Sequence, residues 1–383
     1  MYDLIISLPF FTCLFGTVEL ILCLKTLYNR PRAWLLPWTV ATTLLYGSHY
    51  IFFSKGTWLL PVTDTIYSMC NLAVYPLYLL YIRELTNHCS YRESVRWLLY
   101  IIIPIMLAAA AMAWIYAEMS ENELKLFCDG YLYATNIDTN LTGWAAAQAM
   151  LHNVCRAIFC IQVIVTAFLG MRWIKAYNDL ISQLYADTED KEMSNIAILF
   201  NLLLLTSVMS VVVNALGRSH FFGQQWIALP ALCFSVLLYA IGYVGRRQDF
   251  SIEDIADEED TTTHITPEAE DSHSSHIQHE LATADIILRL HQLVDEKQMY
   301  LQPNLKLDDL TRSLNTNRTY LLKAMKQELQ MTFTEYINRK RIVYAQHLMQ
   351  QHPDMSKTEI AERSGYASTS SFYRCLRMFG TSQ

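Results

Sequence analysis

Charged residues are scarce in this sequence. They make up 17% of the 383 residues, whereas a soluble globular protein carries about a quarter. The nine cysteines are odd in number, scattered and without a CxxC pair, which excludes a disulfide scaffold. Hydrophobic residues make up 52% and aromatic residues 12%, which excludes a wholly disordered chain, a collagen and a low-complexity fibre. Part of the chain is therefore predicted to lie in a non-aqueous medium.

Long apolar runs follow one another through the first 247 residues. Seven of them are long enough to cross a hydrocarbon core, which takes roughly 20 residues of helix. These runs are Leu4–Leu27, Ala33–Phe53, Thr65–Tyr81, Trp97–Tyr116, Gln148–Met171, Asn195–Leu216 and Trp226–Val244. The loops on one side hold eleven Lys and Arg residues, against Lys55, Lys125 and Arg218 on the other. This positive-inside bias predicts seven transmembrane helices with the N-terminus outside and the C-terminal part in the cytoplasm.

Four ionisable side chains fall inside these runs: Glu19, His49, His152 and Arg156. Ionisable groups at that depth are costly, so they usually face the interior of the bundle and often mark a functional site. They are our candidates for sensing a signal within the membrane. The alternative is that they lie near the interfaces or form helix–helix hydrogen bonds. One hypothesis pairs Glu19 with Arg156.

The charge pattern changes twice after the last apolar run. Residues 251–280 carry ten acidic residues and no Lys or Arg, a composition that predicts a disordered linker over residues 248–281. Residues 281–383 carry 14 Lys and Arg against ten Asp and Glu. The sequence therefore predicts three parts, at residues 1–247, 248–281 and 282–383, which correspond to membrane, linker and a basic soluble domain.

The basic domain has a helical pattern, since its apolar residues recur at three- and four-residue spacing. The predicted helices are Lys306–Leu314, Asn317–Leu329, Thr332–Gln350, Ser356–Arg363 and Thr369–Met378. Turns at Asn315-Thr316 and at Gly365 divide them into two helix-turn-helix units joined by one helix. Such an arrangement can place two helices in successive major grooves of DNA.

The second unit carries a series of signature residues. They are Ile360-Ala361, Gly365-Tyr366, Ser371-Phe372-Tyr373-Arg374, Leu376-Arg377 and Phe379-Gly380. Together with Leu310, Leu314, Phe333, Tyr336, Ile337, Arg341 and Ala345 upstream, they resemble the double helix-turn-helix domain of the AraC/XylS family of transcription regulators. The sequence departs from the family at Thr311, where Ala is usual, and at Gln330, where Gly is common.

The resemblance implies roles for the polar residues of the two recognition helices. Arg318, Thr319 and Lys323 of the first unit and Thr369, Ser370 and Arg374 of the second are expected to face bases. Lys326, Arg339 and Arg377 are expected to contact phosphates.

The whole sequence thus predicts an all-α protein in which a seven-helix transmembrane bundle precedes an AraC-type DNA-binding domain. We expect a one-component transcription regulator of the bacterial inner membrane, without enzymatic activity, cofactor or metal. Its expected partners are double-stranded promoter DNA, the lipid bilayer and an unidentified small-molecule or membrane signal, with homodimerisation left open. The alternatives are a transporter or membrane enzyme with an appended DNA-binding domain, and a passive membrane anchor.

Overall fold

The computed structural model describes most of the chain. The described residues are 2–26, 29–53, 59–87, 89–133, 141–188, 191, 193, 196–198, 200–201, 203–205, 207–208, 228–247 and 285–380. All regular elements within these ranges are helices, as predicted. The chain divides into two compact units, which are described separately. Unit 1 comprises Met1–Ile174 and Met193–Asp257, and unit 2 comprises Lys175–Glu192 and Glu258–Gln383.

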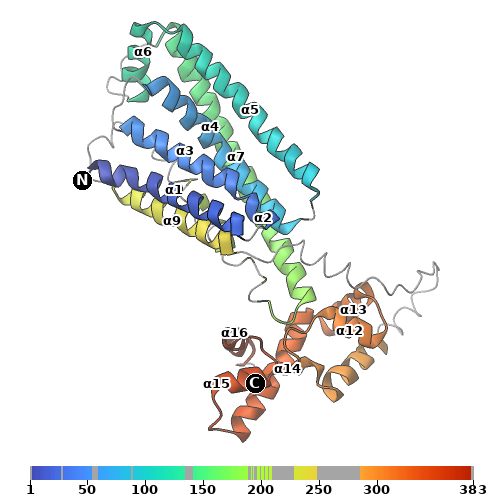
Figure 1. The fold of residues 1–383 in the computed structure, drawn as a ribbon. Coiled ribbons are helices and arrows are strands. Elements are labelled where there is room, and N and C mark those ends of the chain that lie inside the picture. The colour runs from blue at the N-terminus through green and yellow to red at the C-terminus, as the bar shows by residue number, and fades with distance from the viewer. Residues whose placement is uncertain are drawn as a thin grey trace, which may run out of the picture. The chain divides into compact units, whose positions relative to one another are not determined.

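Unit 1 is a bundle of long helices (Figure 1). Its helices are α1 (Tyr2–Thr26), α2 (Arg30–Ala33), α3 (Leu36–Phe53), α4 (Leu60–Thr86), α5 (Tyr91–Glu118), α6 (Glu121–Phe127), the first part of α7 (Gly143–Leu184) and α9 (Ala228–Arg247). Helix α1 packs against α3 and α9, α3 packs against α4, and α4 packs against α5. Capping boxes at Ser90 and Ser120 begin α5 and α6, since each serine and the glutamate three residues later satisfy each other's backbone N–H groups.

Four helices of the described residues are long and apolar enough to cross a membrane. These stretches are Ile5–Thr26, Leu60–Thr86, Tyr91–Glu118 and Gly143–Leu184. They contain nearly all of the first predicted segment and all of the third, fourth and fifth, and the second and seventh lie largely within α3 and α9. Much of the sixth, Asn195–Leu216, lies outside the described residues. The count of seven spans therefore stays a prediction, as does the linker, which lies outside the described residues too.

Apolar side chains line the outside of α5 and α7. Leu107 of α5 and Ile164 of α7 each leave 67% of their surface exposed, and Phe168 leaves 63% exposed. Contiguous exposed apolar side chains on a monomeric soluble protein usually mark an interaction surface.

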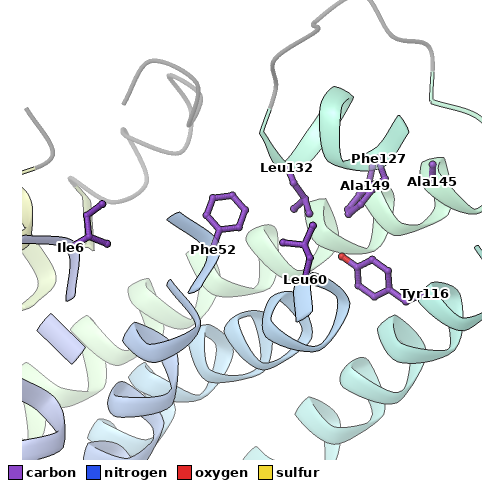
Figure 2. Packing of buried hydrophobic residues seen from close by; sticks show 8 residues of the cluster. All are labelled: Ile6, Phe52, Leu60, Tyr116, Phe127, Leu132, Ala145 and Ala149. Atoms are coloured by element: carbon purple, nitrogen blue, oxygen red, sulfur yellow. The ribbon is translucent and has the colours of Figure 1, made fainter. Parts of the chain in front are cut away.

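A compact apolar cluster closes one end of unit 1 (Figure 2). It consists of Ile6, Phe52, Leu60, Tyr116, Phe127, Leu132, Ala145 and Ala149. Helix α6 and the π-helical turn after it, Cys128–Leu132, bring Phe127 and Leu132 against the ends of longer helices. Phe127 is fully buried, and its ring meets the Tyr116 ring edge-on at 5.9 Å. Helix α6 and the turn after it are thus folded onto the bundle.

Unit 2 contains the C-terminal helices and a short stretch of the chain from much earlier in the sequence. Its elements are η5 (Gln292–Glu296), η6 (Met299–Leu301), α12 (Leu307–Leu314), α13 (Arg318–Ala324), η7 (Met325–Leu329), α14 (Phe333–Gln351), α15 (Lys357–Arg363) and α16 (Thr369–Phe379). Residues Lys175–Glu192, which include the end of α7, also belong to it. The sequence had assigned those residues to the apolar part.

Candidate DNA-binding surface

The first helix-turn-helix unit is built from α12 and α13. Asn315 ends α12 in the left-handed conformation with φ at 51°, which Asn tolerates better than most residues. The side chain of Asn317 then accepts a hydrogen bond from the backbone N–H of Tyr320 and so caps α13. Leu310 and Leu321 are fully buried between the two helices. Local sequence therefore sets both the turn and the start of the first recognition helix.

The second unit repeats this construction with α15 and α16. Ser356 caps α15 by accepting from the N–H of Glu359, and Ser368 caps α16 by accepting from the N–H of Ser371. Between the helices, Gly365 has a φ of +83°, a region that side chains other than glycine rarely occupy. A common apolar core holds this helix-turn-helix unit to α14. The core consists of Ile342, Ala345, Ile360, Ala361, Tyr366, Phe372 and Cys375. Burial raises the pKa of the Tyr366 hydroxyl and of the Cys375 thiol, so both groups stay neutral near pH 7.

Helix α14 joins the two helix-turn-helix units, and Arg341 fixes the position of this helix. This arginine is fully buried, and its Nε and Nη2 donate to the carbonyl oxygens of Tyr300 and Gln302, at 2.7 Å each. Its guanidinium also lies 5.3 Å from the centre of the Tyr366 ring, a cation–π contact. Burial lowers the pKa of Arg341 from its ordinary value. The residue belongs to the predicted family signature, and its contacts show a structural role.

The polar residues predicted for the first recognition helix have different environments. Arg318 forms two hydrogen bonds of 2.6 Å with the carboxylate of Asp308 in α12. Lys323 and Lys326 are exposed on α13 and η7. Thr319 belongs to α13, but its side chain lies outside the described residues. Two lysines thus face solvent, whereas Arg318 is held within the domain.

The second recognition helix shows a similar division. Ser370 and Arg377 are exposed and Thr369 is half-buried. Arg374 donates from Nη2 to the hydroxyl of Thr188 at 3.0 Å. On α14, Arg339 pairs with Glu335 one turn earlier at 2.7 Å, and its guanidinium lies over the Phe379 ring.

Residues 185–188 contact this surface, which the sequence did not predict. The side chain of Asp187 accepts from the backbone N–H of Ala367 at 2.9 Å and from the hydroxyl of Ser371 at 2.5 Å. Asn338 of α14 donates to the carbonyl oxygen of Ala186. The sequence carried one indication of this contact, the run of acidic residues that begins at Asp187 and could face the basic domain.

The four candidate sensing residues of unit 1 are not brought together in a single site. Glu19 pairs with Arg246 of α9 at 2.5 Å, in place of the hypothesised partner Arg156. Arg156 is exposed, and its guanidinium lies over the Tyr131 ring. The ring of His49 lies 6.1 Å from that of Tyr67 and 6.2 Å from that of Tyr46.

His152 belongs to a buried polar group. Its Nε2 lies 2.7 Å from Oδ2 of Asp64, the oxygen to which the Tyr116 hydroxyl donates. Its Nδ1 lies 2.9 Å from the carbonyl oxygen of Gln148. A carbonyl only accepts, so Nδ1 carries a proton, and the contact between Nε2 and the carboxyl group then needs a second proton. The sequence did not single out Asp64, which lies 88 residues away from His152.

Comparison with known families agrees with the helix-turn-helix geometry. Residues 310–382 match the family model of a helix-turn-helix domain, of the AraC type. The match begins within α12 and covers the rest of both helix-turn-helix units and α14. It identifies the C-terminal part as a DNA-binding domain of the kind found in transcription regulators. Searches of curated proteins and of solved structures found no match.

Proposed function

We propose that this chain is a membrane-bound, one-component transcription regulator whose apolar unit senses a signal and whose C-terminal unit binds promoter DNA. The observation that carries the proposal is the presence, in one chain, of two helix-turn-helix units and four helices able to cross a membrane. A signal received by the apolar unit then changes DNA binding without a separate messenger protein. The predicted seven spans and the cytoplasmic C-terminus belong to this proposal.

The DNA contacts that we propose follow the placement of each residue. Exposed Ser370 and Lys323 lie on the recognition helices and would read bases, together with Thr369, Thr319, Arg318 and Arg374. Lys326, Arg339 and Arg377 would contact phosphates. Arg318 and Arg374 have protein partners in this structure and would exchange them for DNA.

Among the candidate sensing residues, His152 has the strongest structural support. Its pairing with Asp64 in an apolar unit holds a proton in a buried place, and Tyr116 connects the pair to α5. A ligand or a proton that alters this group would act on α4, α5 and α7 together. We propose Glu19, His49 and Arg156 as further sensing residues.

The test uses the full-length protein in nanodiscs. We expect it to retain a defined set of genomic duplex fragments, and reporter fusions after Gln383 to be active only in the cytoplasm. Fusions in the loop between α5 and α7 are the topology control and should report the opposite side. A C-terminal reporter outside the cytoplasm, or retention of no fragment at low salt, would contradict the proposal. Transport of a substrate by a chain lacking residues 281–383 would favour the transporter alternative.

A further inference from the structure

Residues Tyr185–Thr188, which we name the strap, run across the DNA-binding domain within unit 2. The backbone N–H of Ala186 donates to the carbonyl oxygen of Leu305 at 3.1 Å, and Tyr185 forms an isolated antiparallel bridge with Lys306. The side-chain amide of Asn338 donates to the carbonyl oxygen of Ala186 at 2.8 Å. The strap thus binds the entry to α12 and the middle of α14 through its backbone.

The side chains of the strap bind the second recognition helix. Asp187 accepts two hydrogen bonds at the start of α16, from the N–H of Ala367 and from the hydroxyl of Ser371. Thr188 accepts one from Arg374, one turn further along α16. Asp187 and Thr188 are 8% and 1% exposed, so the contact is a built interface rather than a loose surface association.

The groups that the strap occupies are of the kind that DNA uses. In a helix-turn-helix domain, the N-terminal residues of the recognition helix enter the major groove, and backbone N–H groups at helix N-termini bind phosphate oxygens. The positive end of the helix dipole attracts an anion, and the Asp187 carboxylate supplies one. Four of the six residues from Asp187 to Glu192 are acidic, whereas residues 281–383 carry a surplus of four basic ones. The Asp187 carboxylate of the strap therefore presents to α16 the negative charge that a DNA phosphate would present.

We propose that the strap is an autoinhibitory segment that competes with DNA for α16. The proposal rests on the proposed DNA-binding function. The strap directly follows α7, the helix that carries His152 in unit 1, so the signal would travel along α7 to the strap rather than through residues 248–281. With the strap bound, only the fraction of molecules in which it is released can take up DNA, which lowers the apparent affinity by that fraction.

The experiment measures duplex binding by full-length protein in nanodiscs, with a labelled pool of random-sequence duplexes at low salt as the probe. Asp187→Asn keeps the shape of the side chain but removes its charge, and Thr188→Val removes the acceptor for Arg374. We expect Asp187→Asn to bind the pool about tenfold more tightly, since hydrogen bonds to a charged group are among the stronger ones. Thr188→Val should bind a few-fold more tightly, since it removes one hydrogen bond of the strap, whereas Asp187→Asn affects two.

Asp179→Asn is the matched control, because Asp179 is exposed on α7 within the same segment and loses the same charge. It should change affinity by less than about twofold. Equal affinities of Asp187→Asn and Asp179→Asn for the duplex pool would overturn autoinhibition by the strap and leave the proposed DNA-binding function standing. Weaker binding by Asp187→Asn would do so as well, because a purely structural role at the cap of α16 predicts that loss. If none of the proteins bound duplex at low salt, the proposed DNA-binding function would fail, and the strap with it.

Hydrogen exchange supplies a readout that a structural role would not move. The N–H of Ala186 is bonded to Leu305, and that of Ala367 to Asp187. Saturating duplex should speed the exchange of the Ala186 amide in the wild-type protein, because DNA displaces the strap. Retained protection of Ala186 in the DNA-bound protein would show that DNA and strap bind together, which overturns competition.

Discussion

Arg318 and Asp308 form a fork-to-fork ion pair across the first helix-turn-helix unit, with Nε and Nη2 each 2.6 Å from a carboxylate oxygen. Two parallel hydrogen bonds of this kind fix geometry as well as charge. The pair ties the first turn of α13 to α12, and its side chains are 26% and 17% exposed. Arg318 therefore holds the two helices together.

We predict that Asp308→Asn lowers the local stability of this unit by about 1 kcal/mol, since it removes the charge from a partly exposed pair. The measurement is native-state hydrogen exchange of the α13 amides in the full-length protein. Arg312→Gln is the control, because Arg312 is exposed on the same helix, and it should change the opening free energy by less than about 0.5 kcal/mol. Equal effects of the two variants would show that the pair contributes nothing.

Gly365 lies against the backbone of η6. A Cβ atom at this position would stand 2.6 Å from the carbonyl oxygen of Leu301, and φ is +83°. We predict that Gly365→Ala destabilises the second helix-turn-helix unit by about 2 kcal/mol or more, because the backbone strain of a positive φ adds to the clash with Leu301. Faster exchange of the α16 amides would report the loss.

The control for this substitution is Gly242→Ala, where no atom beyond the chain neighbours and the backbone of its own helix lies within 4 Å of the added Cβ. It should leave α16 unchanged. Protection of α16 that is the same in Gly365→Ala as in the wild-type protein would contradict the prediction.

Gln330 presents the opposite case, since it occupies a left-handed position that glycine would fill with less strain. Its φ is 52°, at the end of η7, and its side chain is exposed. The left-handed conformation costs a residue with a Cβ about 1 kcal/mol. We predict that Gln330→Gly stabilises the first helix-turn-helix unit by about 0.5 kcal/mol. The rest of the relieved strain is offset by the greater conformational freedom of glycine in the unfolded chain.

Exchange of the amides of η7 measures this gain. Glu328→Gly is the matched control, since Glu328 is exposed and helical two residues earlier, and it should destabilise by about 1 kcal/mol. A loss of protection in both variants would show that Gln330 has a favourable role that its geometry does not reveal.

Local sequence determined much of this fold. The helices of both helix-turn-helix units, their caps at Ser356 and Ser368 and the turn at Gly365 were predictable, because each depends on residues within a few positions. Long apolar runs likewise predicted the helices of unit 1. The Asp187–Ser371 and Asp64–His152 contacts were not predictable, since they join residues 184 and 88 positions apart. For the same reason, Glu19 could not be assigned to Arg246 before the packing of α1 on α9 was known.

The Glu19–Arg246 pair can be tested by a double-mutant cycle. We predict that Glu19→Gln and Arg246→Gln are coupled by about 1 kcal/mol, because removal of either charge leaves the other without its partner in an apolar unit. All eight Trp residues lie in the first 226 positions, so Trp fluorescence during thermal unfolding reports on unit 1. The cycle of Glu19→Gln with Arg156→Gln is the control and should be additive. Additivity in both cycles would contradict the pair.

Arg377 offers a test of phosphate contact that does not require knowledge of the operator. It is exposed on α16, and Arg363 is exposed on α15 with Glu359 as an ion-pair partner. A lost phosphate contact lowers the slope of log affinity against log salt by about 0.9 and weakens all duplexes alike. We predict this result for Arg377→Gln in the full-length protein, measured on several unrelated duplexes between low and moderate salt. Arg363→Gln should leave the slope within about 0.3 of the wild-type value, because Arg363 lies at the end of α15 and not on the recognition helix. An unchanged slope for Arg377→Gln would remove it from the DNA interface, and a loss confined to one duplex would make it a base contact.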